Sequence, residues 1–420
     1  MTYITLLGRI PAISLAELER TFGSKAVSPF STETATVESE TFDIQRFGGI
    51  IKAGTIALEL QSNAWSEVSK KIVQHYTDKW STQSGKQTLG ISVYGWTVSP
   101  RDIQKTGLIL KSKLKSHGRS LRLIPNISPA LNTATSHHNK LGLSDNKTEL
   151  LVVRGNNGKV IVAESIGAQN ISALAARDQE RPKRDTFVGM LPPKLALTMV
   201  NLAVGEGLDN NLPSADLTRL ERQRTAREAD VTITQTRLTV LDPFCGTGVI
   251  LQEAALLGHD TYGTDLSDKM IDYSRQNMEW LIDKYHLRTK FTTLQGDAMD
   301  TSWQAPIDAV ACETYLGQPF SAPPRPEKLK EVRNLCNHIV SSFLDNISTQ
   351  LKPGTPLCLA VPAWRDDRGN LTHLPIAQNI ATIEKLGFTT IKLSHVRNED
   401  LIYYREDQVV ARQLLLLEKV

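Results

Sequence analysis

The sequence Leu241-Asp-Pro-Phe-Cys-Gly-Thr-Gly248 decides how the second half of the chain is expected to fold. It follows a short apolar strand and precedes Val249–Leu257, an apolar segment typical of a buried helix. Glycines at such a strand-to-helix turn allow positive φ and let the backbone approach a ligand. Leu251 occupies the position of the third glycine in the dinucleotide fingerprint, which makes nicotinamide and flavin dinucleotides poor candidates.

Acidic residues recur at the expected ends of the next two strands. Asp265 stands nineteen residues after Gly246, where a carboxylate can accept hydrogen bonds from both hydroxyls of a ribose. Asp297, followed by Ala298, ends the next strand, where a carboxylate can accept a hydrogen bond from an adenine amine. Ligands of open α/β sheets bind at the carboxyl ends of the strands, so these loops together predict a nucleoside-containing cofactor.

Strands and helices alternate through the rest of this half, which predicts a parallel, doubly wound sheet covered on both faces. The second helix is expected at Lys269–Tyr285, and the last two strands, with no helix between them, are expected to form a hairpin at the sheet edge. The expected strands are Leu238–Asp242, Asp260–Asp265, Lys290–Gln295, Ile307–Glu313, Pro356–Pro362, Thr389–His395 and Arg412–Lys419.

The front half has α+β character. Ser14, with Glu17 three residues later, predicts a capping box at the start of the first helix. Asn156-Asn157-Gly158 predicts the turn of a β-hairpin. The other expected elements are strands at Gly49–Glu59 and Gly90–Trp96 and helices at Ser66–Lys79 and Arg101–Leu114.

Charge is distributed unevenly along the 420 residues. Residues 1–185 carry 24 Lys/Arg and 16 Asp/Glu, a balance of +8, whereas residues 186–420 carry 24 and 29, a balance of −5. The run 101–122 contains seven basic residues and a single acid, Asp102. Such a run is usually a solvated helix face, but a basic front half on an acidic rear half favours a polyanionic partner.

Composition excludes several classes of protein. No stretch of about 18 consecutive apolar residues occurs, so we expect no membrane span, and the first residues lack the pattern of a signal peptide. The four cysteines form no Cys-x-x-Cys pair, which argues against a zinc site and for a cytoplasmic location. We interpret Cys245 and Cys312 as buried fillers rather than nucleophiles, and His137-His138 as a surface pair rather than metal ligands, and we expect no metal.

Asp242–Gly248 resembles motif I of class I S-adenosylmethionine-dependent methyltransferases, in the form typical of THUMP-domain RNA methyltransferases. Arg181–Asp185 and Gly189–Ala196 are similar to the segment that precedes motif I in the tRNA guanine-N2 methyltransferases of that family. Leu131–Leu143 and the hairpin after it are similar to the end of their THUMP domain. The resemblance is specific from about residue 131 to residue 317 and diffuse in the first 90 residues.

The resemblance implies a Rossmann-like class I methyltransferase domain (α/β) behind α+β domains that include a THUMP-like RNA-binding domain. We expect an N-terminal ferredoxin-like domain at 1–88, the THUMP-like domain at 89–168, and the methyltransferase domain at 169–420 with an insertion near 205–236. The implied cofactor is S-adenosyl-L-methionine. The residues expected to bind it are Asp242, Pro243, Phe244, Gly246, Thr247, Gly248, Asp265, Asp297 and Ala298.

The sequence departs from the family at the end of the fourth strand. Relatives carry an Asp/Asn-Pro-Pro-Tyr motif there, whereas this chain has Glu313-Thr-Tyr-Leu-Gly317. The carboxylate and the glycine remain, both prolines are lost, and the aromatic residue, Tyr315, stands one position earlier. We expect Glu313 to orient or deprotonate the acceptor amine and Tyr315 to stack on the base.

By this resemblance the expected activity is methylation of a tRNA base, at guanine N2. Two alternatives stay open: an RNA-binding protein with a vestigial methyltransferase domain, and a DNA amino-methyltransferase. The residues expected to contact RNA are Lys111, Lys113, Lys115, Arg119, Arg122, Arg181 and Arg184.

Overall fold

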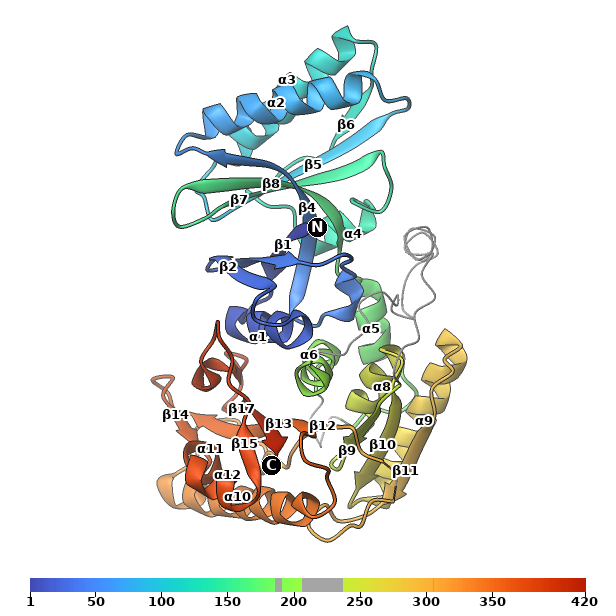
Figure 1. The fold of residues 1–420 in the computed structure, drawn as a ribbon, viewed down its shortest axis with the longest axis vertical. Helices are drawn as coiled ribbons and strands as arrows, with labels where there is room; N and C mark the ends of the chain where they lie inside the picture. The colour runs from blue at the N-terminus through green and yellow to red at the C-terminus, as the bar shows by residue number, and fades with distance from the viewer. Residues whose placement is uncertain (186–190, 206–236, 305) are drawn as a thin grey trace.

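The computed structural model describes residues 1–185, 191–205, 237–304 and 306–420. In this part of the chain two mixed sheets lie one above the other along the long axis of the molecule (Figure 1). The first sheet belongs to the front half and the second to the rear half. Helices α1 (Pro11–Phe22) and α6 (Pro193–Val204) lie between them.

The described residues of the front half form one eight-stranded sheet in the order β2-β3-β1-β4-β8-β7-β5-β6. Its long central strand β4 pairs with β1 on one side and β8 on the other, so it joins the two ends of the sheet. The bounds are β1 (Thr2–Leu7), β2 (Val27–Ser31), β3 (Thr34–Glu38), β4 (Ile50–Gln61), β5 (Gln87–Tyr94), β6 (Leu121–Leu123), β7 (Lys147–Arg154) and β8 (Lys159–Ala168).

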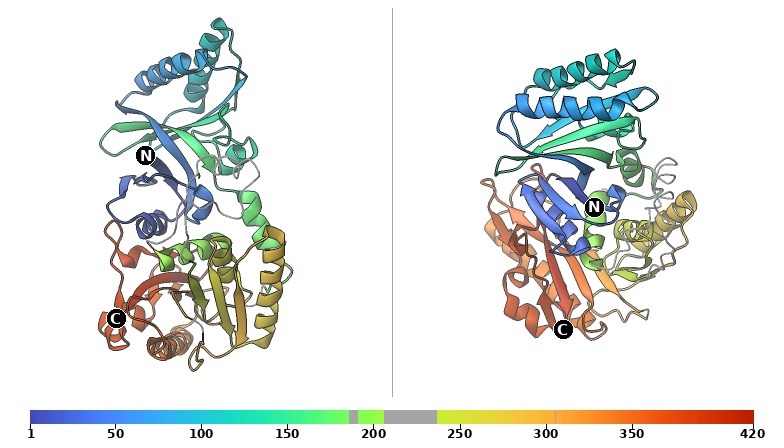
Figure 2. Two further views of the ribbon diagram at one scale, coloured as in Figure 1. Left: turned by 45° about the vertical axis from the view of Figure 1, so that its right-hand side comes forward. Right: turned by 45° about the horizontal axis from the view of Figure 1, so that its top comes forward.

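This sheet continues across residue 88, where a boundary between two domains is predicted from the sequence. Helix α2 (Trp65–Ser81) packs beside α3 (Pro100–Ser116), and both share one apolar core with β5, β7 and β8. Val68 and Trp80 of α2 are buried in that core with Leu110 of α3. Both helices lie at the end of the molecule farthest from the rear half, as all three views show (Figures 1 and 2).

Helix α1 begins at Pro11 and not at the predicted capping box. Proline is favoured at the first helical position because the N–H that it lacks would have no intrahelical partner there. Ser14 Oγ instead accepts a hydrogen bond from the Gly8 N–H at 3.1 Å. The Glu17 carboxylate accepts from the N–H groups of Gly48 and Gly49, at 2.9 and 2.7 Å. Both side chains therefore secure loops of the tertiary structure rather than the end of the helix.

The described residues of the rear half form a nine-stranded sheet whose main path is β11-β10-β9-β12-β13-β17-β15. The strands from β11 to β13 are parallel, and β17 is antiparallel to its neighbours β13 and β15. The bounds are β9 (Thr239–Asp242), β10 (Asp260–Asp265), β11 (Phe291–Gln295), β12 (Ala309–Glu313), β13 (Pro356–Arg365), β14 (Leu371–His373), β15 (Phe388–Thr390), β16 (Ile402–Tyr403) and β17 (Val410–Lys419).

The predicted alternation of strands and helices is confirmed through this sheet. Helices α8 (Val249–Leu256) and α9 (Asp268–Tyr285) begin and end within one residue of their predicted limits. The last predicted hairpin is partly wrong: β15 and β17 do pair, but β16 lies between them in the sequence, and β15 ends at Thr390. After β15 the chain leaves the sheet. The N–H groups of Ser394 and His395 donate hydrogen bonds to the Glu19 carboxylate of α1.

Successive residues of each central strand point to opposite faces, and both faces are buried. Val240, Ala311 and Ala360 pack against α6, while Leu241 and Val310 pack against α10 (Pro326–Ser348). Helices α11 (Pro375–Gln378) and α12 (Ile380–Lys385) extend the α10 layer. Within the described ranges, no helix is both long enough and apolar enough to span a membrane.

The two halves share a core at α6, which is buried along nearly its whole length. Ile13 and Ala16 of α1 belong to the same apolar cluster as α6 and the strands of the rear sheet. Arg20 Nε donates to the carbonyl of Leu202 at 3.0 Å. The insertion expected near 205–236 lies outside the described residues except for Gly205, as do residues 186–190 before Leu191.

Candidate cofactor and acceptor site

The loop after β9 forms a tight turn that opens helix α8. The buried Asp242 side chain accepts from the Phe244 N–H at 3.1 Å. Gly248 is the N-cap of α8 and has φ of 81°, and Gly246 has φ of 50°; both values favour glycine. Among the described residues, a Cβ atom on Gly246 would come within 4 Å of the Phe244 carbonyl oxygen alone, at 3.9 Å, so this backbone borders open space.

Asp265, at the end of β10, holds two backbone amides with its two carboxylate oxygens. Oδ2 accepts from the Gly246 N–H and Oδ1 from the Ser267 N–H, each at 2.9 Å. The first bond joins the ends of β9 and β10, which are parallel neighbours. Burial raises the pKa of Asp265, and the two amide donors oppose that shift. A carboxylate has about four acceptor positions, so each oxygen retains a lone pair for a ligand hydroxyl.

The loop after β11 is held by Asp297. Its carbonyl oxygen accepts from Thr301 N–H at 2.8 Å, and its side-chain Oδ1 accepts from Met299 N–H at 2.9 Å. Ala298, the next residue, is buried. The turn therefore stands at the carboxyl edge beside Asp265, where the sequence places it.

Glu313, at the end of β12, forms an ion pair that the sequence does not reveal. Arg412 of β17 donates to Glu313 Oε1 through Nε, and the exposed fractions of the two side chains are 9% for arginine and 17% for glutamate. Arg412 lies 99 residues further along the chain and comes from the antiparallel strand two positions away in the sheet. No short-range spacing could have indicated it.

Three carboxylates meet at this edge of the sheet. Desolvation raises the pKa of Asp242 well above its ordinary value, and the negative charges of Asp265 and Glu313 add to the shift. Negatively charged groups gathered at one edge favour a cationic ligand.

Tyr315 is 43% exposed just past the strand, so its ring is accessible to a partner. Thr314 between it and Glu313 is buried, and its N–H donates to the Ala360 carbonyl at 3.0 Å. Gly317 has φ of 84°, and a Cβ atom there would lie 2.6 Å from Val332 Cγ1. A turn close to α10 therefore requires the glycine that this segment keeps.

Asn277 of α9 was not predicted, yet it ties the segment before residue 186 to the glycine loop. Its side-chain Nδ2 donates to the carbonyls of Lys183 and Thr247, both at 2.9 Å, and its Oδ1 accepts from Lys183 N–H. Cys245 and Cys312 are buried, as interpreted from the sequence, and burial raises the pKa of both thiols. Thiolate nucleophiles are therefore disfavoured at both positions.

The basic residues of the front half divide by exposure. Lys111, Lys113 and Lys115 of α3 are exposed, as are Arg122 and Arg184. Arg119 is half-buried, with Nε donating to the Ser81 carbonyl at 2.8 Å. Arg181 is only 3% exposed beside the buried pair Arg177–Glu253. The prediction that Arg181 contacts RNA is therefore at odds with its burial.

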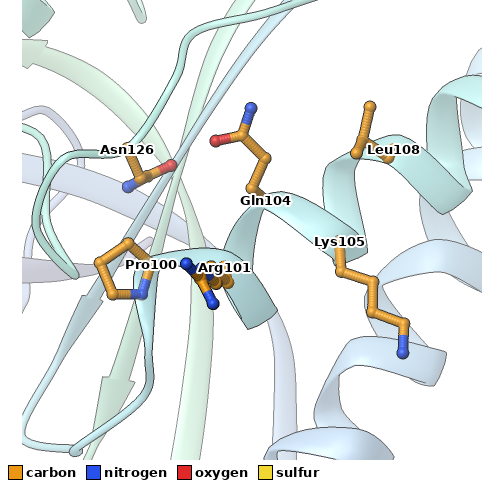
Figure 3. Close-up of a pocket in the computed structure, with 6 residues that line it drawn as sticks. All are labelled: Pro100, Arg101, Gln104, Lys105, Leu108 and Asn126. Atoms are coloured by element: carbon orange, nitrogen blue, oxygen red, sulfur yellow. The ribbon is translucent and has the colours of Figure 1, made fainter.

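An open hollow of about 230 Å³ lies at the start of α3 (Figure 3). Arg101 and Lys105 contribute positive charge to it, Leu108 an exposed apolar side chain, and Asn126 the opposite wall. The side chain of Asn126 is held in place by the Ile91 carbonyl at 2.8 Å.

The strand order, the glycine turn and the acidic strand ends define the rear half as a Rossmann-like class I methyltransferase domain. In agreement, residues 240–338 match the family profile described as "Methyltransferase domain".

Two curated relatives are both described as tRNA (guanine(10)-N2)-dimethyltransferase. The one from Methanothermobacter thermautotrophicus is 28% identical over 191 residues, 45% of this chain and 44% of the relative. The one from Pyrococcus abyssi is 42% identical over 103 residues, 24% of this chain and 30% of the relative. The chain thus spans less than half the length of these relatives. The resemblance to tRNA guanine-N2 methyltransferases is confirmed by these matches.

Among solved structures, TrmN from Thermus thermophilus aligns over 100% of both chains, with 17% identity and a TM-score of 0.49.

Proposed function

We propose that the protein is an S-adenosyl-L-methionine-dependent methyltransferase that modifies a base of tRNA, at guanine N2. The observation that carries the proposal is the carboxyl edge of the rear sheet. Asp265, which accepts a hydrogen bond from the glycine loop, ends β10, and Glu313 ends β12, two positions away at the same edge. The similarity to the two tRNA (guanine(10)-N2)-dimethyltransferases supports the choice of acceptor.

The residues at this edge fit the proposed cofactor. Asp265 would accept from the ribose hydroxyls with its remaining lone pairs, and Asp297 would lie near the adenine. The open space at Gly246 leaves room for the methionine part beside the backbone. When bound, the cofactor supplies a methyl group on a positively charged sulfur, and the acidic surroundings of Asp242 suit that charge.

Glu313 and Tyr315 would hold the acceptor. Glu313 Oε1 is occupied by Arg412, and a hydrogen bond from a base amine to Oε2 would fix the amine at the strand end. Tyr315, partly exposed two residues later, would stack on a base that has left its helix. The chain contributes chiefly orientation to the transfer step.

The front half would hold the tRNA by its backbone. The exposed lysines of α3 lie on the helix layer farthest from the rear half, so this surface is open to a large ligand. Contacts to phosphates and to the shape of an RNA helix need no base recognition. We retain Lys111, Lys113, Lys115, Arg119, Arg122 and Arg184 for this surface and leave out the buried Arg181.

One observation favours a second candidate, an RNA-binding protein with a vestigial methyltransferase domain. Glu313 is paired with a cation of the protein itself, as a carboxylate with a purely structural role would be. Equilibrium titration separates the two candidates, because a vestigial domain would not bind S-adenosylmethionine even at millimolar concentration.

The decisive experiment is incubation of the protein with bulk tRNA and methyl-labelled cofactor, followed by nucleoside analysis. The proposal expects label in N2-methylated guanosine. Label in a different nucleoside would refute the acceptor, and tight cofactor binding without transfer to any tRNA would refute the reaction. Competition with duplex DNA distinguishes a DNA amino-methyltransferase.

A further inference from the structure

We propose that Arg412 is a positioning residue, which holds the Glu313 carboxylate turned toward the acceptor amine. The inference rests on the proposed function and extends it to a residue of β17, outside the segment Glu313–Gly317. It follows from strand register, from the charges at the sheet edge and from the single bond between the two side chains.

Register places both side chains on the same face of the rear sheet. Glu313 pairs with Ala360 of β13, and Ala360 pairs in turn with Leu414 of β17. Arg412, two residues before Leu414, pairs with Pro362. Since side chains alternate along a strand, Glu313 and Arg412 point to the face on which Ala360 and Leu414 pack against α6.

That face is the one turned toward the front half. α6 packs against α1, and Arg9, just before α1, lies over the ring of Tyr403 at 5.3 Å. Tyr403 pairs with Arg412 across β16 and β17. Glu313 and Arg412 therefore lie at the carboxyl edge of the strands, on the side of the rear sheet that faces the front half.

The charges explain why a cation is needed there. Asp242 at the end of β9 is buried, and the negative charge of Glu313 acts on it. Arg412 places a positive charge directly on Glu313 at this edge and holds one of its two oxygens.

The geometry of the pair leaves a site for substrate. Arg412 binds Oε1 through Nε, and among the described residues no hydrogen-bond donor reaches Oε2. One oxygen is thus anchored by the protein and the other is available to the acceptor. The two missing prolines of the family motif would otherwise have stiffened this segment. We infer that the ion pair replaces that stiffness in this chain.

Arg412→Met tests the inference, because methionine keeps much of the side-chain volume and removes the charge. Single-turnover methylation of tRNA should slow by roughly ten- to a hundredfold, with tRNA and cofactor affinities within about twofold of wild type. Arg412→Lys, which restores the cation, should recover most of the rate.

Two further proteins complete the test. Arg397→Met, which breaks an exposed pair with Asp400 in the same domain, serves as the matched control and should transfer methyl groups at the wild-type rate. The double variant Glu313→Gln/Arg412→Met leaves no unpaired buried charge and so protects against a folding defect. It should be no slower than Glu313→Gln alone, because Arg412 acts through Glu313.

The outcomes separate the inference from the function on which it rests. A wild-type rate for Arg412→Met, or an equal loss in the presence and absence of Glu313, would overturn the positioning role while leaving the methyltransferase proposal intact. Wild-type protein that transfers no methyl group to tRNA would overturn both.

Discussion

Asp265 is the residue whose contacts bear most directly on the proposed cofactor site. Its carboxylate joins the ends of two strands and still has acceptor capacity. We expect Asp265→Ala to weaken S-adenosylmethionine binding by roughly 1–3 kcal/mol, because ribose hydroxyls would have no partner in a partly closed site. Calorimetric titration measures this. Asp272→Ala, an exposed carboxylate on α9, is the control. Equal cofactor affinity in Asp265→Ala and wild type would remove Asp265 from the site.

Substitutions of Glu313 and Tyr315 should affect methyl transfer in different ways. Glu313→Gln keeps the shape, alters the acceptor and breaks the charge pair with Arg412, so turnover should fall roughly ten- to a thousandfold with little change in binding. Tyr315→Ala should instead cost about 1–3 kcal/mol of base stacking. Single-turnover kinetics over a range of tRNA concentrations separates rate from affinity. A near wild-type rate for Glu313→Gln would show that this carboxylate has no chemical role.

At the scale of elements, α3 is expected to be the main electrostatic contact with RNA. Replacing Lys111, Lys113 and Lys115 by Gln should weaken tRNA binding and lower the slope of log affinity against log salt, by somewhat less than about one for each phosphate that is no longer neutralised. Cofactor affinity should not change. The matched control replaces three exposed lysines of the rear half, Lys330, Lys352 and Lys385. If both triple variants show the wild-type salt slope, the lysines of α3 form only a solvated face.

The strands and helices of the rear half were largely predictable from the sequence. The side-chain contacts between residues distant in the sequence were not. Turn residues on either side of a short segment indicate where strands such as β10, which is buried along its interior, begin and end, because these are properties of neighbouring residues. The pairing of Glu313 with Arg412 depends on β17 entering the sheet antiparallel, which no local pattern encodes. The capping box failed for a related reason: the donors that Glu17 accepts from, Gly48 and Gly49, are distant in sequence.

The exposure of a side chain and the extent of a sheet also depend on residues that are distant in the sequence. Arg181 carries a charge that suggests a surface position, yet it is buried where α5 (Ile171–Gln179) meets α8 and where Arg177 pairs with Glu253. The continuity of one sheet across residue 88, which β4 provides by pairing with strands on both sides, could likewise not be read from local patterns. Sequence patterns report the character of each segment, whereas its neighbours depend on the topology of the whole sheet.

For the whole molecule, the junction between the halves is a shared core rather than a flexible linker. α1 supplies apolar side chains to the core of the rear sheet, and its polar residues bind across the junction. Glu17 accepts from Asn201 Nδ2 of α6 at 2.7 Å, and Glu19 accepts from the N–H groups after β15. The distance from the first sheet to Glu313 is therefore fixed by packing, which in the proposed function would set how far the modified base lies from the gripped part of the tRNA.

Glu17 makes this junction sensitive to pH. Burial raises the pKa of Glu17 to about 7 from its ordinary 4.5, and the hydrogen bonds from Asn201, Gly48 and Gly49 offset only part of that shift. Between these two values the native protein binds a proton that the unfolded chain does not. The stabilisation is therefore complete below about pH 4.5 and is lost as the pH rises through about 7, a change on the order of 3 kcal/mol.

Glu17→Gln removes this titration while keeping the shape of the side chain. Glutamine cannot accept from both glycine amides, because its Nε2 is a donor, so the variant should be less stable than wild type at pH 5. Wild type should lose stability between pH 5 and pH 8 through this group and the variant should not, so the gap between their thermal unfolding midpoints should narrow with rising pH. Glu279→Gln, an exposed change on α9, should follow wild type throughout. A gap of the same size at pH 5 and pH 8 would show that Glu17 keeps one protonation state over this range and that the junction is not a site of pH sensitivity.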